Sequence, residues 1–257
     1  MLRPTSPDET IMFATGAKSK GYAMVDTSRD IFLRHEHQVA VSYAGLRHAS
    51  FGALGCTFEG CDFSNMRPDS ISFASGREPT QYRQCRFDGS RFKKVIAGQA
   101  RFEKCTFLDV DIRGLFAHSA EFIDCVFSGV LRTSVFFGRV FGNDQKDVPR
   151  TVNEFRGNDF SAMKFIDVGF RQGIDLSLQR LPEGDGYLYL RNAGQKLASF
   201  RQKYTQQPPS KRRQEVFEFL KRPEEEVRDG QVDLFMCKDS EPLLSRDAVD
   251  AIWDELR

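Results

Sequence analysis

The stretch "CRFDGSRFKKVIAGQARFEKCTFLDVDIRGLFAHSAEFIDCVFSG", residues 85–129, repeats every five residues. Every fifth position is apolar: Phe87, Phe92, Ala97, Phe102, Phe107, Ile112, Ala117, Phe122 and Phe127. The positions two before each of these are small or aliphatic, from Cys85 to Cys125. A helix needs a period of about 3.6 residues and a flat strand a period of about 2, so a period of five fits neither. It predicts a coil that turns a corner every five residues, with two side chains of each side pointing inward.

A longer period of 20 residues gives the size of this coil. Cys85, Cys105 and Cys125 lie 20 residues apart, which corresponds to four sides of five residues. Stacked turns then place each residue about 4.8 Å from the residue 20 positions later, as in neighbouring strands. Opposite charges at that separation should pair across turns. The expected pairs are Arg91 with Asp111, Arg101 with Glu121 and Lys104 with Asp124.

The register extends beyond this stretch but is interrupted twice. Upstream, "GREP" at residues 76–79 adds four residues, and its removal places Asp62 beside Arg86. Weaker matches carry the register back to about residue 41. Downstream, the phase is lost from about 139 to 152, around "GNDQKDVPR", and returns at Phe155, Phe160, Phe165 and Phe170. We therefore expect a repeat domain over residues 41–175, with insertions near 76–79 and 139–152.

The units "CTFEG CDFSN" and "CRFDG SRFKK" resemble those of the pentapeptide repeat proteins, over about residues 41–175. The resemblance implies a mainly β fold, a right-handed quadrilateral β-helix with a solid interior. Phe and Cys stand here where Leu and Ala are commoner in that family. Units of this kind are also similar to those of the fluoroquinolone-resistance members. Those members bind DNA gyrase, resemble duplex DNA in shape and charge, and carry loops that protrude from the coil.

The two ends of the chain lack the repeat. Residues 1–40 contain two candidate strands, "TIMFATG" and "GYAMVD", and we expect them to form an N-terminal β cap over the open end of the coil. Residues 176–257 predict a helical or mixed region. In this region "LPEGDGYLYL" reads as a turn and a short strand, followed by helices within 191–204 and 211–230.

The C-terminal segment "SRDAVDAIWDEL", residues 245–256, is the clearest helix. Ser245 can cap its first turn, and Asp247 suits the helix dipole there. Its apolar face comprises Ala248, Val249, Ile252, Trp253 and Leu256. This face either packs on the coil end or neighbouring helices, or it forms a homodimer or partner interface through Val249, Ile252, Trp253 and Leu256.

Charge and composition restrict the possible partners. The 257 residues carry a net charge of +1, so direct nucleic-acid binding is not expected. Residues 41–175 contain 18 Lys plus Arg and 16 Asp plus Glu, which is not the acidic balance that DNA mimicry requires. The sequence has neither an apolar run of membrane-spanning length nor an apolar signal-peptide core at its start. We expect a cytoplasmic protein without a membrane partner.

Cysteine and histidine do not predict catalytic or metal chemistry. Five of the six cysteines occupy repeat positions and are expected to be buried free thiols, while Cys237 stays unassigned. The pair "HEH", His35 and His37, supplies two metal ligands without a third, so a solvated surface pair is expected. There is no phosphate-binding glycine loop, nucleophile elbow or dinucleotide fingerprint. We expect no enzyme activity, no cofactor and no metal.

These observations favour a non-catalytic protein that presents a rigid, four-sided surface to a protein partner, in a scaffold or immunity-type role. The alternative is DNA-mimic binding that protects DNA gyrase or topoisomerase. The insertions depart from the period within the coil, so they are the predicted interaction loops. Their candidate residues are Arg77, Glu78, Asp144, Lys146 and Asp147.

Overall fold

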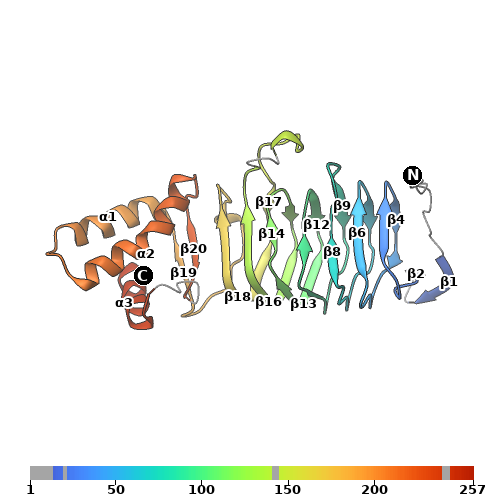
Figure 1. Cartoon of the computed structure of the whole chain (residues 1–257), viewed down its shortest axis with the longest axis horizontal. Helices are drawn as coiled ribbons and strands as arrows, with labels where there is room; N and C mark the ends of the chain where they lie inside the picture. Colours follow the sequence, from blue (N-terminus) through green and yellow to red (C-terminus); the bar gives the residue numbers. More distant parts are fainter. Residues whose placement is uncertain (1–13, 20–21, 141–144, 239–243) are drawn as a thin grey trace, which may run out of the picture.

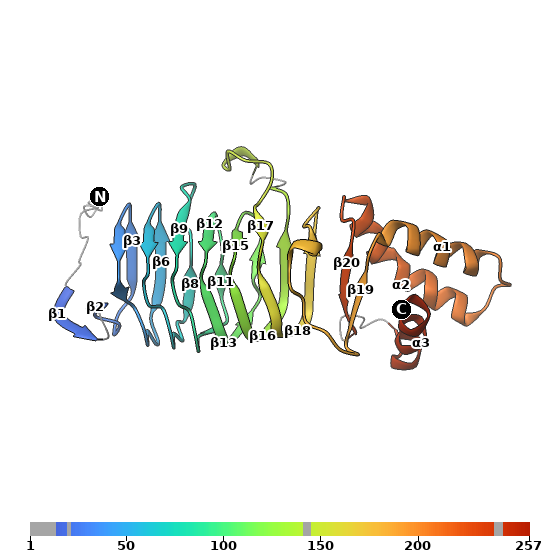
Figure 2. The same ribbon diagram turned by 180° about the vertical axis from the view of Figure 1, so that it is seen from behind.

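A computed structural model describes residues 14–19, 22–140, 145–238 and 244–257. The chain forms an elongated β-solenoid with a small hairpin at its N-terminal end and helices at its C-terminal end (Figure 1). The view from behind shows the same order of elements along the axis (Figure 2). The mainly β solenoid predicted from the five-residue period is therefore confirmed.

The solenoid consists of parallel ladders that run along its axis. The first ladder, which we call the ion-pair face, contains β4 (His37–Val39), β7 (Thr57–Glu59), β9 (Thr80–Arg83), β12 (Ala100–Glu103), β15 (Glu121–Ile123) and β17 (Phe155–Arg156). The second, the groove face, contains β3 (Ile31–Arg34), β6 (Ser50–Leu54), β8 (Ser70–Ser72) and β11 (Val95–Ile96). The third contains β10 (Arg91–Phe92), β13 (Thr106–Arg113), β16 (Val126–Phe137), β14 (Phe116–Ala117) and β18 (Asp159–Arg171).

The register of these ladders matches the predicted period. Arg101 lies between Gln81 and Glu121, 20 residues away on either side. Phe58 pairs with Tyr82, a step of 24 residues, so the four-residue insertion at 76–79 is where the sequence placed it. Phe122 pairs with Phe155, which accommodates the second insertion within one step.

One change of register was not predicted. Val110 pairs with Gly129, so the step there is one residue shorter than 20, and the phase shifts well before residue 139. Gly129 has φ +105°, and a Cβ at this position would lie 2.2 Å from the carbonyl oxygen of Val110. Glycine therefore allows the two backbones to approach closely where the turn loses a residue.

The solenoid also begins earlier than the predicted boundary at residue 41. β3 pairs with β6 and β4 with β7, both in parallel and at 20-residue spacing. The core positions there hold Ile31, Leu33 and Gln38, all buried, in place of the phenylalanines that revealed the period elsewhere. A hairpin of β1 (Ala14–Ser19) and β2 (Tyr22–Val25) precedes them, and β2 pairs in parallel with β5 (Val41–Ser42).

Columns of stacked aromatic rings fill the coil. Phe102 stacks between Tyr82 and Phe122, with ring centroids 4.9 Å away on each side. A second column runs through Phe63, Phe87, Phe107, Phe127 and Phe160, with centroid spacings from 4.4 to 5.0 Å. Every fifth residue from Phe87 to Phe127 is buried, as predicted. Each phenylalanine among them contributes about 1.5–3 kcal/mol by leaving water.

Four cysteines form a column beside the aromatic rings: Cys61, Cys85, Cys105 and Cys125. These four and Cys56 are buried thiols outside any disulfide, as predicted for the five in the repeat, and Cys237 is buried as well. The Cys105 Sγ donates to the carbonyl oxygen of Tyr82 on the preceding turn, at 3.3 Å. Burial raises the pKa of the Cys105 thiol well above its usual value, so it stays protonated and behaves as a small apolar side chain.

A second hairpin joins the coil to the helices. β19 (Tyr187–Leu190) pairs antiparallel with β20 (Leu234–Cys237), downstream of a short 3-10 turn, η2 (Leu176–Leu178). Phe235 and Cys237 pack into the coil core, whereas Leu188, Leu190 and Leu234 pack with the helices. The buried side chain of Gln231 accepts hydrogen bonds from the backbone N–H groups of the last turn. This arrangement assigns Cys237 to the closure of the coil.

Three helices follow: α1 (Ala193–Thr205), α2 (Lys211–Arg228) and α3 (Arg246–Leu256). The Ser245 hydroxyl accepts a hydrogen bond from the Ala248 N–H group and caps α3, as predicted. The apolar face of α3 packs against the other helices. Its members Val249, Ile252, Trp253 and Leu256 are all buried. Of the two alternatives for this face, the structure therefore shows packing on neighbouring helices and not an exposed interface, because the chain itself covers it. Among the described residues, no helix is long and apolar enough to cross a membrane.

Replacing Phe102 by alanine tests the aromatic columns. We expect Phe102→Ala to lower the free energy of unfolding by about 3–5 kcal/mol, because it leaves a cavity between two stacked rings. Chemical denaturation monitored by circular dichroism measures the change. The control is Ile96→Ala on the exterior, which should change stability by no more than about 0.5 kcal/mol. Equal losses for the two variants would show that the columns do not dominate stability.

Candidate interaction site at the loop edge

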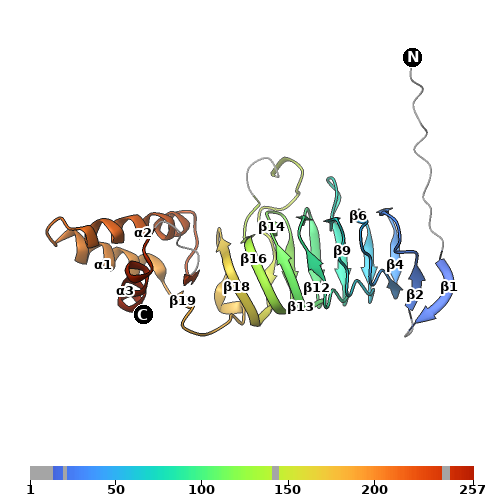
Figure 3. The same cartoon turned by 60° about the horizontal axis from the view of Figure 1, so that its bottom comes forward.

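Both insertions leave the coil at the same corner, which we call the loop edge (residues 75–80, 138–140 and 145–154). Figure 3 shows the two loops rising side by side from one long edge of the solenoid. The Arg77 Nε lies 2.9 Å from the Asp147 Oδ1. The amide of Gln99 joins them from below, since its Nε2 donates to the carbonyl oxygens of Arg77 and Asp147. Segments about 60 residues apart in sequence thus form one surface.

Histidine extends this surface toward the N-terminal turns. His35 Nδ1 lies 3.1 Å from Glu78 Oε2. His37 Nε2 instead lies 3.5 Å from Glu59 Oε1, on the ion-pair face. The two imidazoles therefore contact different carboxylates, which agrees with the surface-pair interpretation. Over the residues that the structure describes, no group of three or more His, Cys, Asp or Glu side chains could hold a metal ion.

The structure brings together three of the five predicted loop residues: Arg77, Glu78 and Asp147. Lys146 is exposed beside Asp147, while Asp144 lies outside the described residues. Arg77 is 80% exposed, so its pairing with Asp147 stabilises the fold by at most about 1 kcal/mol. These charged groups are accessible to a partner at little cost to stability.

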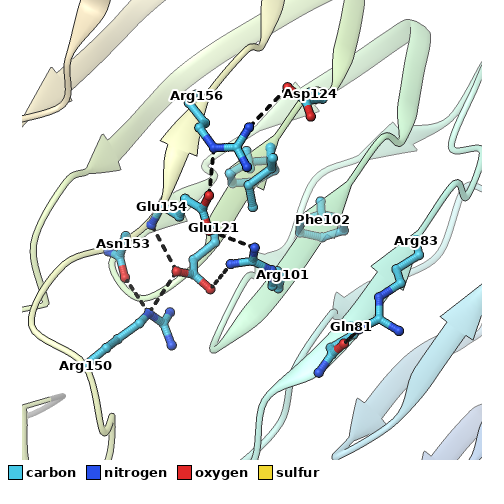
Figure 4. A network of polar contacts seen from close by, with 12 residues as sticks. Gln81, Arg83, Arg101, Phe102, Glu121, Asp124, Arg150, Asn153, Glu154 and Arg156 are labelled. Atoms are coloured by element: carbon cyan, nitrogen blue, oxygen red, sulfur yellow. Dashed lines mark hydrogen bonds and ion pairs between the residues drawn. The ribbon is translucent and has the colours of Figure 1, made fainter. Parts of the chain in front are cut away.

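A buried carboxylate holds residues 150–154, the segment that returns from the longer loop to the coil and that we call the return limb (Figure 4). Glu121 is 8% exposed and lies 3.1 Å from Arg101 and 3.3 Å from Arg150. Its Oε1 also accepts a hydrogen bond from the backbone N–H of Glu154, at 3.0 Å. Arg101 bridges to the Glu154 side chain at 2.7 Å. The network holds both ends of the loop's final segment against β12 and β15.

Further contacts fix the same limb to the corner. Arg150 donates to the carbonyl oxygen of Ser119, and Asn153 Nδ2 donates to those of His118 and Phe137. Sequence reasoning found Arg101 with Glu121 but missed Arg150, Asn153 and Glu154. These three lie where the five-residue period is interrupted, so the 20-residue spacing could not predict which residues they contact.

The charge pairs expected from the 20-residue stacking are mostly present. Arg101 pairs with Glu121, and Arg91 pairs with Asp111 at 3.6 Å. The pair of Arg86 with Asp62, across the insertion, is also confirmed at 3.0 Å. The expected pair of Lys104 with Asp124 is wrong. Asp124 instead lies 3.7 Å from Arg156, which reaches it from the next turn.

The five-residue period, the parallel ladders and the filled core define the class of this chain: it is a mainly β protein built on a parallel β-solenoid with a filled interior. No protein-family model and no curated protein matches the sequence. Solved structures similar to it include two trypsin-treated variants of QnrB1, a plasmid-mediated fluoroquinolone resistance protein. The first is 16% identical and covers 60% of this chain and 78% of its own, with a TM-score of 0.19. The second is also 16% identical, with coverages of 57% and 88% and a TM-score of 0.19.

Excising residues 76–79 tests whether the short loop is separable from the coil. We expect the shortened chain to fold with a stability change of about 1 kcal/mol, because the ion pairs that are lost are exposed and the Gln99 amide keeps its hydrogen bond to the Asp147 carbonyl oxygen. Thermal unfolding monitored by circular dichroism measures the effect. The matched control removes four in-phase residues, 94–97, and should abolish cooperative unfolding because it displaces every following core position. Similar damage in both would contradict the assigned register.

The network at Glu154 predicts a pH dependence. The hydrogen bond from Arg101 holds the pKa of the Glu154 carboxyl below its usual value. A carboxyl with a lowered pKa in the folded state stabilises the protein above its unfolded pKa of about 4.3, and this contribution is lost as the pH falls through the folded value. We expect Glu154→Gln to reduce the loss of stability between about pH 6 and pH 3.

Urea denaturation across that pH range measures the effect. The control is Glu183→Gln at an exposed carboxyl, which should leave the pH profile of the wild type unchanged. Identical profiles for wild type and Glu154→Gln would exclude Glu154 as a contributor.

Proposed function

We propose that this chain is a non-catalytic binding protein that contacts a protein partner through its loop edge. One observation carries the proposal: two separate insertions leave the coil at the same corner and meet through Arg77, Asp147 and Gln99. Loops positioned by a rigid scaffold commonly hold binding residues. The stacked aromatic core supplies that rigidity, and the Glu121 network fixes the base of the longer loop.

The chemistry of the loop edge suits a protein surface. It exposes both signs of charge, at Arg77, Glu78 and Lys146, together with an apolar side chain at Val152, which is 59% exposed. Polypeptides combine such groups, whereas a phosphate backbone offers only negative charge. A scaffold or immunity-type role is consistent with this surface. The buried free thiols support a reducing compartment such as the cytoplasm.

Gyrase or topoisomerase protection is the second candidate, and it rests on the Phe- and Cys-containing repeat units alone. DNA mimicry requires a strongly acidic face. The coil instead pairs Arg101 with Glu121 and Arg86 with Asp62 across its turns. We therefore rank general protein binding above it.

The test compares the wild type with a triple variant of the loop edge, Arg77→Ala, Lys146→Ala and Val152→Ala. Each tagged chain is used to capture proteins from the native host's lysate, followed by mass spectrometry. We expect one protein to be recovered by the wild type and depleted at least about tenfold with the variant, a loss of about 1.4 kcal/mol in binding. Val232→Ala, at an exposed apolar residue near the helices, is the matched control and should retain the partner.

The recovered protein then decides between the candidates. Gyrase or topoisomerase subunits, together with altered supercoiling by the purified chain, would favour protection. A partner recovered equally by wild type and triple variant would refute the loop edge. Recovery of the chain itself, with a doubled mass in light scattering, would indicate a homodimer.

A further inference from the structure

The groove face carries an apolar depression that the loop edge does not use. Its outward positions are Phe32, Gly52, Ser72 and Ile96, which succeed one another across β3, β6, β8 and β11. Phe32 is 50% exposed and Ile96 63% exposed. Together with neighbouring residues they line an open groove of about 620 Å³, which we call the apolar groove. On the ion-pair face, by contrast, charged side chains such as Arg101 and Glu121 occupy the corresponding positions.

The groove exists because small residues separate two large ones. Gly52 and Ser72 form its floor, between Phe32 and Ile96. The Phe32 ring lies over Gly52, where a Cβ would come within 2.5 Å of the ring. The Arg34 guanidinium packs over the same ring, 5.1 Å from its centroid. Phe32 is thus held in place as a wall of the groove, although half of its surface remains in contact with water.

Two lysines border the groove directly before β11, and further cations lie on the neighbouring side of the coil. Lys93 and Lys94 belong to its lining. Arg47 and Arg67 lie outside the groove lining, on the neighbouring side of the coil in line with Arg91. Their backbones form a parallel β-bridge between adjacent turns, so like charges are stacked there. We call Arg47, Arg67, Lys93, Lys94 and Arg113 the basic strip. All five are exposed.

The cations of the basic strip lack the carboxylate partners that neutralise cations elsewhere on the coil. Among the described residues, none of its five cations lies within ion-pair distance of a carboxylate, although the neighbouring Arg91 pairs with Asp111. The acidic residue that lines the groove, Asp30, instead accepts a hydrogen bond from the Ser50 backbone at 2.6 Å. Stacked like charges disfavour the folded coil. A bound anionic partner would remove that repulsion.

We propose that the apolar groove and the basic strip together bind an acidic polypeptide segment. Its apolar side chain would lie between Phe32 and Ile96, and its carboxylates would pair with the basic strip. Charge complementarity selects an acidic partner, and the apolar floor selects a polypeptide. A nucleic-acid backbone could pair with the cations but would leave Phe32 and Ile96 without apolar contacts from its phosphates. The inference extends the proposed function by naming the partner chemistry of a second surface.

Fluorescence anisotropy with the full chain tests this site. The probe is a fluorescein-labelled peptide of Asp and Glu residues around a central Leu-Phe pair. Three competitors accompany it: the same acidic peptide with Ser-Ser at its centre, the Leu-Phe peptide with Lys in place of the acids, and a duplex DNA. We expect the acidic Leu-Phe peptide to bind best, at least about tenfold more tightly than the Ser-Ser peptide, and to weaken as salt rises.

Variants locate the binding on the protein. Lys93→Glu with Lys94→Glu should weaken the peptide at least about tenfold, and Ile96→Ser should weaken the Leu-Phe peptide but not the Ser-Ser peptide. Lys93→Gln with Lys94→Gln should give an intermediate loss, which guards against misfolding of the charge-reversed chain. Arg77→Glu at the loop edge should leave peptide binding unchanged.

Three results would overturn the proposal: no binding of the acidic Leu-Phe peptide, binding that the lysine variants do not alter, or tighter binding of the DNA. None of them would affect the loop-edge proposal, which depends on Arg77, Lys146 and Val152 and is measured by capture of a different partner.

Discussion

Face-to-face stacking of aromatic rings between successive turns is the interaction on which this structure depends. Each turn places its rings under those of the next, with the Phe87 and Phe107 centroids 4.6 Å apart. The spacing of stacked strands is about 4.8 Å, close to the distance at which flat rings fit without a gap. Backbone hydrogen bonding and ring packing therefore favour the same rise per turn. A residue inserted within a side would break both at once, so the chain places its insertions at a corner.

This constraint explains which parts of the fold could be predicted from sequence. The core positions could be predicted from Phe, Cys and Ala at fixed spacing, because a filled coil accommodates few other side chains at those positions. The N-terminal turn escaped detection because Ile31, Leu33 and Gln38 fill the same space with less characteristic residues. The 19-residue step at Gly129 was not predicted either, because the loss of one residue does not change the types of residue in the repeat.

The functional surfaces were less predictable, for a different physical reason. Sequence identified both insertions, yet the contact of Arg77 with Asp147 depends on the corner from which each loop leaves. The apolar face of α3 showed only that something must cover it, and the covering helices belong to the same chain. The apolar groove depends on Gly52 and Ser72, whose small size matters only once they are known to point outward between Phe32 and Ile96. Outward positions tolerate many residue types, so their pattern carries meaning only after the register is known.

The unequal closure of the two ends has a mechanical consequence. At the C-terminal end, the β19–β20 hairpin shares one face with the coil core and the other with the helices, and Gln231 holds the last turn. At the N-terminal end, β2 is joined to the coil by the pairing of Ala23 with Val41 and Met24 with Ser42. A stacked coil loses its turns from an end, since each interior turn is held by two neighbours. Under tension or attack by a protease, we therefore expect the described part of this rod to lose its first turns, β3 and β4, before the turns next to the helices.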